Sequence, residues 1–314
     1  MAGGSEDLSQ SSSDEVLTAG LAAIAPAARA VLLSFLADEV SAAVAACGLL
    51  LALEEIGAAL QAIEPLAATH SRVRELSRLL AANRHRAEPI AAIVREHVAE
   101  VGRGASPEER IAGLRSFFDR AVARSAEASV ALYSLGDPEV LAAATAEVVE
   151  LLDRWGLLGP GRAALEIGCG IGRFETALAG RLREIHGIDV SPGMVATARR
   201  RAAGLGNVHF ALTAGRDLAL FRPAVFDLVF AVDSFPYLQL AGGDVAAAHV
   251  REAARVLRPC GDLVLLAFSY RGDQAADRAD FLNLCESAGF EALVAGEHPL
   301  HLWDGAAFHA RLRR

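Results

Sequence analysis

The sequence predicts an α/β domain built on a mainly parallel sheet and preceded by an all-helical region. Residues 15–101 are rich in alanine and have helical spacing, without the clusters of β-branched residues that favour strands. From about residue 158, strand and helix patterns alternate, which is typical of parallel strands joined by helices. A glycine-rich turn at 168–172 joins an apolar strand directly to a helix.

The chain of 314 residues divides by composition into three expected parts. Residues 1–14 are rich in glycine, serine and acidic side chains, and we expect them to form a disordered leader. Residues 15–157 are expected to form the helical region, as a bundle, a lid or a dimerisation element. Residues 158–314 are expected to form the α/β domain.

The composition excludes several classes of partner. The net charge of −9 and the pI of about 5.5 argue against nucleic acid. The longest apolar run, residues 40–53, is too short to span a bilayer and is flanked by acidic residues. No secretion signal is recognisable, and the four cysteines form no Cys-x-x-Cys pair. We therefore expect a cytoplasmic protein that binds neither nucleic acid nor a membrane.

Helices of the N-terminal region are expected to break at Pro26, Gly48, Pro65 and Pro89. The stretch 40–53 is apolar on nearly every face, so it must be buried all round. It lies either at the centre of a bundle or in a homodimer interface, and the sequence leaves both possibilities open.

Two later helices have strong start signals. Ser106 is followed by Pro107 and, three residues after the cap, by Glu109, which is the pattern of a capping box. Asp137 precedes Pro138 and is expected to open a helix that runs to about residue 155.

The α/β domain is expected to contain seven strands with helices between them. The expected strands are Ala163–Ile167, Glu184–Ile188, Val208–Leu212, Phe226–Val232, Asp262–Phe268, Glu291–Glu297 and Ala307–Leu312. The helices are expected to begin near Arg173, Pro192, Asp244 and Ala275.

The turn after the first strand carries Gly168, Gly170 and Gly172, and Glu166 precedes it. A strand that turns at once into a helix needs residues that tolerate positive φ and have no Cβ in the way. The helix N-terminal amides then face whatever lies above the strand end, which suits a polar ligand. The spacing is Gly-x-Gly-x-Gly, whereas the dinucleotide fingerprint is Gly-x-Gly-x-x-Gly. A nicotinamide site is therefore an imperfect fit.

The second strand ends at Asp189, about twenty residues after the glycines. A carboxylate at this place in an α/β nucleotide site binds ribose hydroxyls, in nicotinamide enzymes as well as others. The alternative is that Asp189 caps the helix that begins at Pro192. Ser191 is the better cap for that helix, so we expect Asp189 to be free in an open cleft.

Three stretches carry a family resemblance. The segment Glu166-Ile167-Gly168-Cys169-Gly170-Ile171-Gly172 resembles the first motif of class I S-adenosylmethionine-dependent methyltransferases, (Asp/Glu)-x-Gly-x-Gly-x-Gly. Residues 226–229 resemble the family's Phe-Asp-x-Val strand, and 255–261 resemble its Arg-Val-Leu-x-Pro-Gly-Gly turn, with Cys260 in place of a glycine. The resemblance covers roughly residues 150–312. It implies a Rossmann-like, seven-stranded methyltransferase sheet with helices on both faces.

The resemblance also implies S-adenosyl-L-methionine as cofactor. The residues that it places at the cofactor are Glu166, Gly168, Cys169, Gly170, Asp189, Val190, Met194, Gly215, Arg216, Asp217 and Asp233. The family has an acidic residue directly after the third strand, which this chain lacks. Asp217 comes a few residues later, and backbone groups of Gly215 and Arg216 are the expected substitutes at the adenine.

The resemblance implies substrate contacts from Tyr133 and Tyr237, because segments before the first strand and after the fourth face the cleft in this family. Tyr133 packing a helix corner is the alternative. Asp233, Tyr237 and His249 are candidates for a general base, although His249 also fits a solvated helix residue. Methyl transfer from a sulfonium mainly needs alignment and exclusion of water, so no strong base is required.

We therefore expect an S-adenosylmethionine-dependent methyltransferase that acts on a small molecule, such as a secondary metabolite, without a metal ion. The first alternative is an NAD(P)-dependent oxidoreductase, which the glycine spacing disfavours. The second is a non-catalytic dimeric binding protein with a vestigial cofactor pocket, in which a homodimer forms through the N-terminal helices.

Overall fold

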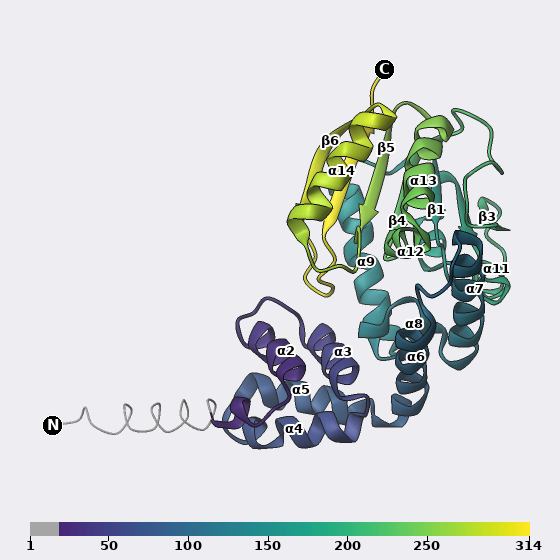
Figure 1. Cartoon of the computed structure of the whole chain (residues 1–314). Coiled ribbons are helices and arrows are strands. Elements are labelled where there is room, and N and C mark those ends of the chain that lie inside the picture. Colours follow the sequence, from purple (N-terminus) through teal and green to yellow (C-terminus); the bar gives the residue numbers. More distant parts are fainter. Residues whose placement is uncertain (1–18) are drawn as a thin grey trace.

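The computed structural model describes residues 19–314, so the expected leader at 1–14 lies outside the described residues. Helices from the first half of the chain form one part of the molecule, and the sheet with its covering helices forms the other (Figure 1). The helices of the first part are α2 (Pro26–Leu36), α3 (Ala42–Leu53), α4 (Ile56–Thr69), α5 (Ser71–Ala82), η1 (Arg84–Arg86), α6 (Ala87–Glu100), α7 (Pro107–Arg124), α8 (Ala126–Val130), η2 (Leu132–Ser134) and α9 (Pro138–Arg154).

The second part is a single seven-stranded sheet of order β3-β2-β1-β4-β5-β7-β6. Its elements are β1 (Gly159–Ile167), α10 (Arg173–Leu178), β2 (Leu182–Asp189), α11 (Pro192–Arg201), β3 (Val208–Leu212), β4 (Phe226–Val232), α12 (Phe235–Ala241), α13 (Gly243–Val256), β5 (Leu257–Leu266), α14 (Gln274–Ala288), β6 (Phe290–Glu297) and β7 (Ala307–Leu312). Strands β1 to β5 are parallel, and β7 runs antiparallel to its two neighbours. The predicted fold class is confirmed.

The predicted helix starts are confirmed in detail. At the start of α7, the Ser106 hydroxyl accepts a hydrogen bond from the Glu109 amide, and the Glu109 carboxylate accepts one from the Ser106 amide. At the start of α9, Asp137 accepts from the Glu139 amide. Ser191 caps α11 by accepting from the Met194 amide at 3.0 Å. These caps satisfy amides that have no partner within the helix.

Three of the four expected helix breaks are wrong. Gly48 lies inside α3, where a Cβ would come within 2.9 Å of a Val31 methyl group, so the glycine allows close packing against α2. Pro65 lies inside α4, and Pro89 is the third residue of α6. The first turn tolerates proline because its amides have no partner there anyway. The break instead falls after α3, at Glu54, whose φ is 62°.

Helix α3 lies at the centre of the helical bundle. Its buried residues contact α2, α4, α5 and η2 within the same chain.

In the part of the chain that the structure describes, no single helix is both long and apolar enough to cross a bilayer. The consecutive helices α3 and α4 reach that threshold only as a pair bent by 117°.

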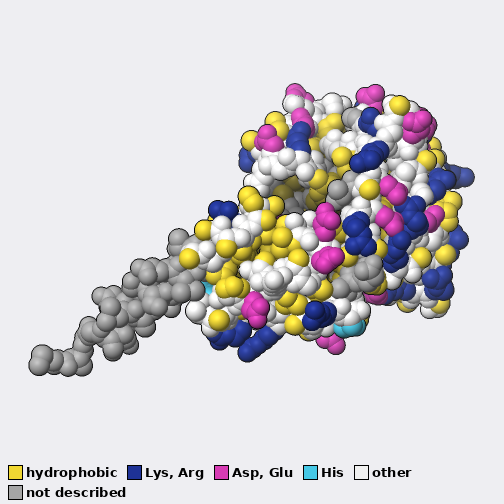
Figure 2. Space-filling view, turned by 60° about the horizontal axis from the view of Figure 1, so that its bottom comes forward, with side chains coloured by type: hydrophobic (Ala, Val, Ile, Leu, Met, Phe, Trp, Pro, Cys, Tyr) yellow, Lys and Arg dark blue, Asp and Glu magenta, His cyan; other side chains and the backbone are white. Residues whose placement is uncertain are grey.

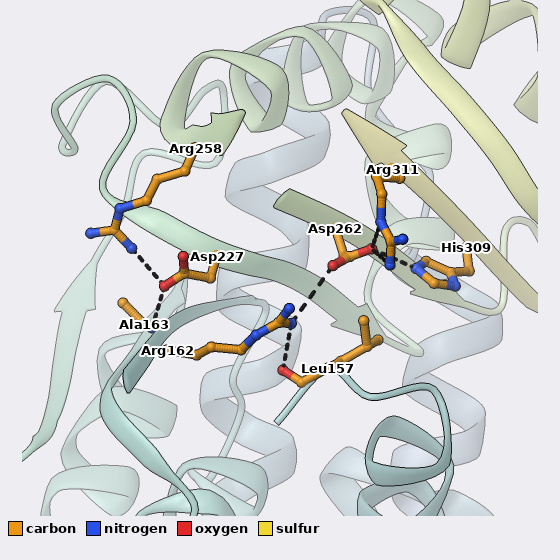
Figure 3. Close-up of polar contacts among 8 residues, drawn as sticks. All are labelled: Leu157, Arg162, Ala163, Asp227, Arg258, Asp262, His309 and Arg311. Atoms are coloured by element: carbon orange, nitrogen blue, oxygen red, sulfur yellow. Dashed lines mark hydrogen bonds and ion pairs between the residues drawn. The ribbon is translucent and has the colours of Figure 1, made fainter. Parts of the chain in front are cut away.

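Charged side chains join the neighbouring strands β5 and β7, away from the glycine turn (Figure 3). Asp262 is fully buried in β5, and its carboxylate accepts from His309 at 3.0 Å and from Arg311 at 2.9 Å, both on β7. Arg162 approaches the second oxygen at 3.7 Å. A buried carboxylate stays ionised at little cost only when it is paired in this way. The polar groups here are therefore structural.

Candidate functional site

A cavity of about 720 Å³ lies between the carboxyl ends of β1, β2 and β4 and the N-terminal helices. Figure 2 shows hydrophobic side chains gathered around a hollow on the face that carries these helices. The helices contribute mainly apolar side chains to the lining, among them Val31, Val44, Leu51, Ile93, Leu114 and Phe117. The sheet contributes the glycine turn and several carboxylates. The cavity thus has a polar end and an apolar end.

The glycine turn has the backbone geometry that its sequence predicts. The φ angles of Gly168, Gly170 and Gly172 are 76°, 51° and 74°, a region that favours glycine. A Cβ on Gly168 would lie 2.4 Å from the Cβ of Ser234, which follows β4. The amides of Gly168 and Cys169 donate to the carbonyl of Ile188 at 2.8 and 3.0 Å, which fixes the turn above β2.

Asp189 lies at the predicted place, but the expectation of an open cleft is wrong. Its side chain is only 8% exposed, and one oxygen accepts from the Gly170 amide at 3.0 Å. The other oxygen accepts from the Ser191 amide at 2.8 Å. Burial raises the pKa of this carboxyl to about 6, against the lowering effect of these backbone hydrogen bonds. Asp189 therefore supports the turn as well as facing the cavity.

Two further carboxyls lie beneath the turn. Glu166 on β1 is 2% exposed and lines the cavity, and its Oε2 has no hydrogen-bond partner among the described residues. Glu175 on α10 is fully buried beside Glu166, and the two carboxyl groups interact with each other rather than with another donor among the described residues. Burial raises the pKa of Glu166, and it raises that of Glu175 to about 7. No motif in the sequence points to Glu175.

The structure separates the predicted adenine-side residues into two groups. Val190, Met194 and Gly215 line the cavity. Arg216 and Asp217 lie outside the lining. Arg216 is exposed and forms an ion pair with Glu108, while the carboxylate of Asp217 accepts from the Ala219 amide at 3.0 Å. The expected side-chain role of Asp217 therefore has no support in the geometry, whereas the expected backbone contact from Arg216 stays a prediction.

Helix α7 covers this part of the site and is tied to it by hydrogen bonds. One oxygen of Asp119 accepts from the Ser191 hydroxyl at 2.6 Å and from the Gly193 amide at 2.8 Å. Arg115 donates to the carbonyl of Val190 at 3.0 Å. The helical region is therefore fixed directly above the end of β2 and the start of α11.

The other end of the cavity holds a cluster of polar aromatic side chains. Asp233, directly after β4, has a φ of 55° and accepts from the Tyr270 hydroxyl at 2.7 Å. Tyr237 on α12 lies edge-on to Tyr270, with ring centroids 5.4 Å apart. The Tyr237 hydroxyl is 3.3 Å from Nε2 of His97 on α6. These side chains all line the cavity. His97 comes from the helical bundle, and the other three come from segments that follow strands of the sheet.

Tyr133 and His249 are placed differently from this cluster. Tyr133 lines the cavity and stacks near Trp303, at a centroid distance of 6.3 Å. His249 is buried in α13, and its Nδ1 lies 2.8 Å from the Val245 carbonyl of its own helix. The alternative of a solvated helix residue is therefore wrong for His249. Burial lowers the pKa of His249, whereas the contact with the Val245 carbonyl raises it and leaves Nε2 as the proton-accepting nitrogen, and His249 also lines the cavity.

Sequence reasoning did not find His97 or Tyr270. His97 follows Ile90, Ile93 and Val94 at helical spacing, so a histidine on the apolar face of a helix was the available signal. Tyr270 follows β5 by a few residues, where the carboxyl ends of parallel strands bring side chains to a shared cleft. Both residues belong to the same cavity only because the helical region covers the sheet.

The fold also gathers one group of possible metal ligands away from the cavity. Glu184 and His186 on β2 and His209 on β3 have ligand atoms within 4.8 Å of one another. No metal-binding spacing in the sequence predicted this group, because the register of two strands assembles it.

The comparison with known proteins agrees with the geometry. Residues 164–261 match the family described as a methyltransferase domain. This segment is a methyltransferase domain of the S-adenosylmethionine-dependent kind. The matched segment begins in β1 and ends in β5, so it includes the glycine turn and Asp189.

Two curated relatives are methyltransferases of quinone-type compounds. The 2-methyl-6-phytyl-1,4-hydroquinone methyltransferase of Synechocystis is 30% identical over 146 residues, which is 44% of each chain. The demethylmenaquinone methyltransferase of Tropheryma whipplei is 34% identical over 110 residues, which is 35% of this chain and 43% of the relative. The chain thus spans less than half the length of the curated relatives that it matches.

Solved methyltransferase structures resemble this one more loosely. Magnesium protoporphyrin IX methyltransferase of Synechocystis has a TM-score of 0.42 and 21% identity, over 55% of this chain and 80% of its own. The N-methyltransferase NodS of Bradyrhizobium japonicum has a TM-score of 0.43 and 18% identity, over 57% and 99%. The family assignment does not depend on these likenesses.

The residues present fit S-adenosylmethionine. A Cβ at Gly170 would lie 2.6 Å from a Val130 methyl group, so the turn is kept free of side chains where the backbone faces the cavity. The unpartnered Oε2 of buried Glu166 is an acceptor for a cationic amine, and Asp189 offers its carboxylate at the end of β2. An acidic cradle of this kind complements a ligand that carries both an ammonium and a sulfonium charge.

Replacing Asp189 with alanine is expected to affect both binding and stability. The amides of Gly170 and Ser191 lose their acceptor, which costs about 1–3 kcal/mol of unfolding free energy. The affinity for S-adenosylhomocysteine is expected to fall about tenfold or more as the turn loses its support. Calorimetry and thermal melting on one sample measure the two effects. Asp217→Ala, an exposed residue outside the cavity, is the control, and intact affinity in Asp189→Ala would remove the residue from the cofactor site.

Proposed function

We propose that this protein transfers a methyl group from S-adenosylmethionine to a small apolar molecule that enters the cavity from the side of the N-terminal helices. One observation carries the proposal. A single cavity of about 720 Å³ joins the acidic glycine-turn end to an apolar end lined by α2, α3, α6 and α7. A ligand pocket of this size and character suits a small molecule beside a cofactor.

S-adenosylmethionine supplies a methyl group that is already activated as a sulfonium. The chain therefore has to bind, orient and exclude water. Glu166 and Asp189 are the residues that would hold the cationic and ribose parts of the cofactor. Helix α7 closes the site through Asp119 and Arg115, and the buried aromatic side chains of the apolar end keep the acceptor out of water.

The apolar lining supports an acceptor with an extended hydrophobic surface. Phe117, Phe118, Tyr133 and Trp303 all face the cavity, and flat aromatic molecules pack well against such rings. The names of the curated relatives point in the same direction, since both describe quinone-type acceptors. A cytoplasmic location and a homodimer through the N-terminal helices stay predictions.

Binding of S-adenosylhomocysteine, measured by calorimetry beside NADH, tests the proposal. We expect binding of S-adenosylhomocysteine in the micromolar range or tighter, about −8 kcal/mol, and no binding of NADH. The reverse result would revive the oxidoreductase alternative. Binding of the nucleoside without methyl transfer to any apolar acceptor in a broad set would favour the non-catalytic alternative.

A further inference from the structure

The polar aromatic cluster at the apolar end of the cavity is held by hydrogen bonds as well as by ring packing. The Tyr270 hydroxyl donates to the Asp233 carboxylate at 2.7 Å, and the Tyr270 ring holds Tyr237 edge-on. Phe118 lies edge-on to Tyr237 from another side, with centroids 5.1 Å apart. Tyr237 is therefore fixed in one orientation, with its hydroxyl 3.3 Å from Nε2 of His97.

The protonation states follow from the surroundings. Burial lowers the pKa of His97 below its ordinary value, so the imidazole is neutral at neutral pH and Nε2 can accept a proton. Burial, reinforced by Asp233, raises the pKa of Tyr237, so its phenol keeps its proton. The Tyr237 hydroxyl therefore donates to His97, which leaves the lone pairs of the phenol oxygen for an acceptor molecule.

Among the described residues, no charged side chain shifts the pKa of His97, which burial alone lowers. Helix α7 presents Phe117 to the imidazole, with centroids 5.5 Å apart. The neighbouring Glu96 is engaged with Arg120 at 2.9 Å and with Arg124 at 2.5 Å. The titratable groups that face His97 from across the cavity are Tyr237 and, behind it, Tyr270 and Asp233.

We propose that Tyr237 and His97 form a proton-accepting pair and that the methyl acceptor is a phenol-type hydroxyl compound. This inference rests on the proposed function. The acceptor oxygen forms a bond to the methyl carbon as the carbon–sulfur bond breaks, with the electron pair left on sulfur. The hydroxyl proton passes to the Tyr237 oxygen, and the Tyr237 proton passes to His97. Charge and atoms balance without another reactant.

The geometry favours a phenol over an amine or an aliphatic alcohol. The aromatic lining accepts a flat ring. A phenol, with a pKa of about 10, can give its proton to a neutral imidazole during the transfer, whereas an aliphatic alcohol is a much weaker acid. An amine at this end would seek a carboxylate, but Oδ1 of Asp233 already accepts from the Tyr270 hydroxyl.

The probes are 1-naphthol and 1-naphthylamine, used with methyl-labelled S-adenosylmethionine and the full chain. We expect label on the naphthol oxygen and far less on the amine. His97→Gln and Tyr237→Phe are each expected to lower kcat about 100-fold, within the usual range for general base catalysis. His85→Gln, an exposed histidine on η1, is the matched control with unchanged kcat.

Two further readouts separate proton acceptance from a structural role. In the wild type, kcat is expected to rise with pH through the titration of His97, below its ordinary value, and His97→Gln should lose that rise. In the complex with S-adenosylhomocysteine, bound 4-nitrophenol should ionise at lower pH in the wild type than in His97→Gln, as followed by its absorbance.

The outcomes separate the two proposals. If S-adenosylhomocysteine binds but the amine is preferred, or neither probe is methylated, the phenol assignment is overturned while the cofactor assignment stands. If both variants keep the wild-type pH profile and the 4-nitrophenol signal, the proton-accepting pair is overturned, even where kcat falls. If S-adenosylhomocysteine does not bind, the proposed function fails and this inference fails with it.

Discussion

Replacing Gly170 with valine is expected to lower the affinity for S-adenosylhomocysteine at least tenfold, about 1.4 kcal/mol. The φ of this residue is 51°, where a β-branched side chain is strained, and the added Cβ would lie 2.6 Å from a Val130 methyl group. The amide of Gly170 also donates to Asp189, so a shift of the turn moves two contacts at once. Calorimetry gives the affinity, and circular dichroism shows whether the fold persists.

The matched control for Gly170→Val is Gly180→Val. Gly180 is exposed, and nothing lies within 4 Å of the position of its added Cβ. We expect that control to bind as the wild type does. A folded Gly170→Val variant with wild-type affinity would contradict the placement of the cofactor at the turn.

Replacing Glu175 with glutamine is expected to stabilise the protein at neutral and higher pH. Burial raises the pKa of Glu175 from 4.5 to about 7, so its ionisation opposes folding. The free energy of unfolding is therefore unaffected by Glu175 below pH 4.5, where the carboxyl is protonated in both states. It falls as the pH rises towards and through about 7, because the unfolded chain ionises first. Glutamine is neutral throughout, so the gain in unfolding free energy should reach about 3 kcal/mol well above pH 7 and vanish below pH 4.5.

Denaturant unfolding over this range of pH measures the effect. Glu286→Gln on α14 is the control, because that carboxylate is exposed and should show no such pH-dependent gain. A Glu175→Gln variant that is less stable than the wild type at every pH would show that the carboxylate is held by attractive contacts instead. Since Asp189 and Glu166 share this environment, the same experiment reports on the acidic cradle as a whole.

The sheet was predictable because each strand has a local signal. Strand β7 lies within the expected bounds, and β4 and β3 do as well. The first strand begins at Gly159, four residues earlier than expected, because its start pairs with β2 across a register shift. Helix α12 was missed, since seven residues after a strand give too short a pattern for periodicity. Gly48 and Pro65 were misread because neighbouring helices, rather than local propensity, keep their helices intact.

The cofactor end of the site was predictable for the same reason. Its residues belong to continuous motifs at the ends of β1 and β2. The acceptor end was not, because His97 and Tyr237 are 140 residues apart in sequence and meet only when α6 lies over the sheet. The burial of Asp189 also depends on this cover, so the sequence indicated its position but not its second role.

The cavity is assembled from two parts of the chain that are separate in sequence. Residues 166–170 and 188–190 supply the end that faces the cofactor, whereas helices before residue 135 supply the roof over the acceptor. On the proposed function, substitutions in the roof alter which molecules fit without touching the turn that binds the nucleoside. Acceptor preference can thus diverge in evolution while the chemistry is inherited unchanged. Exchange of the roof between related chains is therefore a direct route to new methylated products.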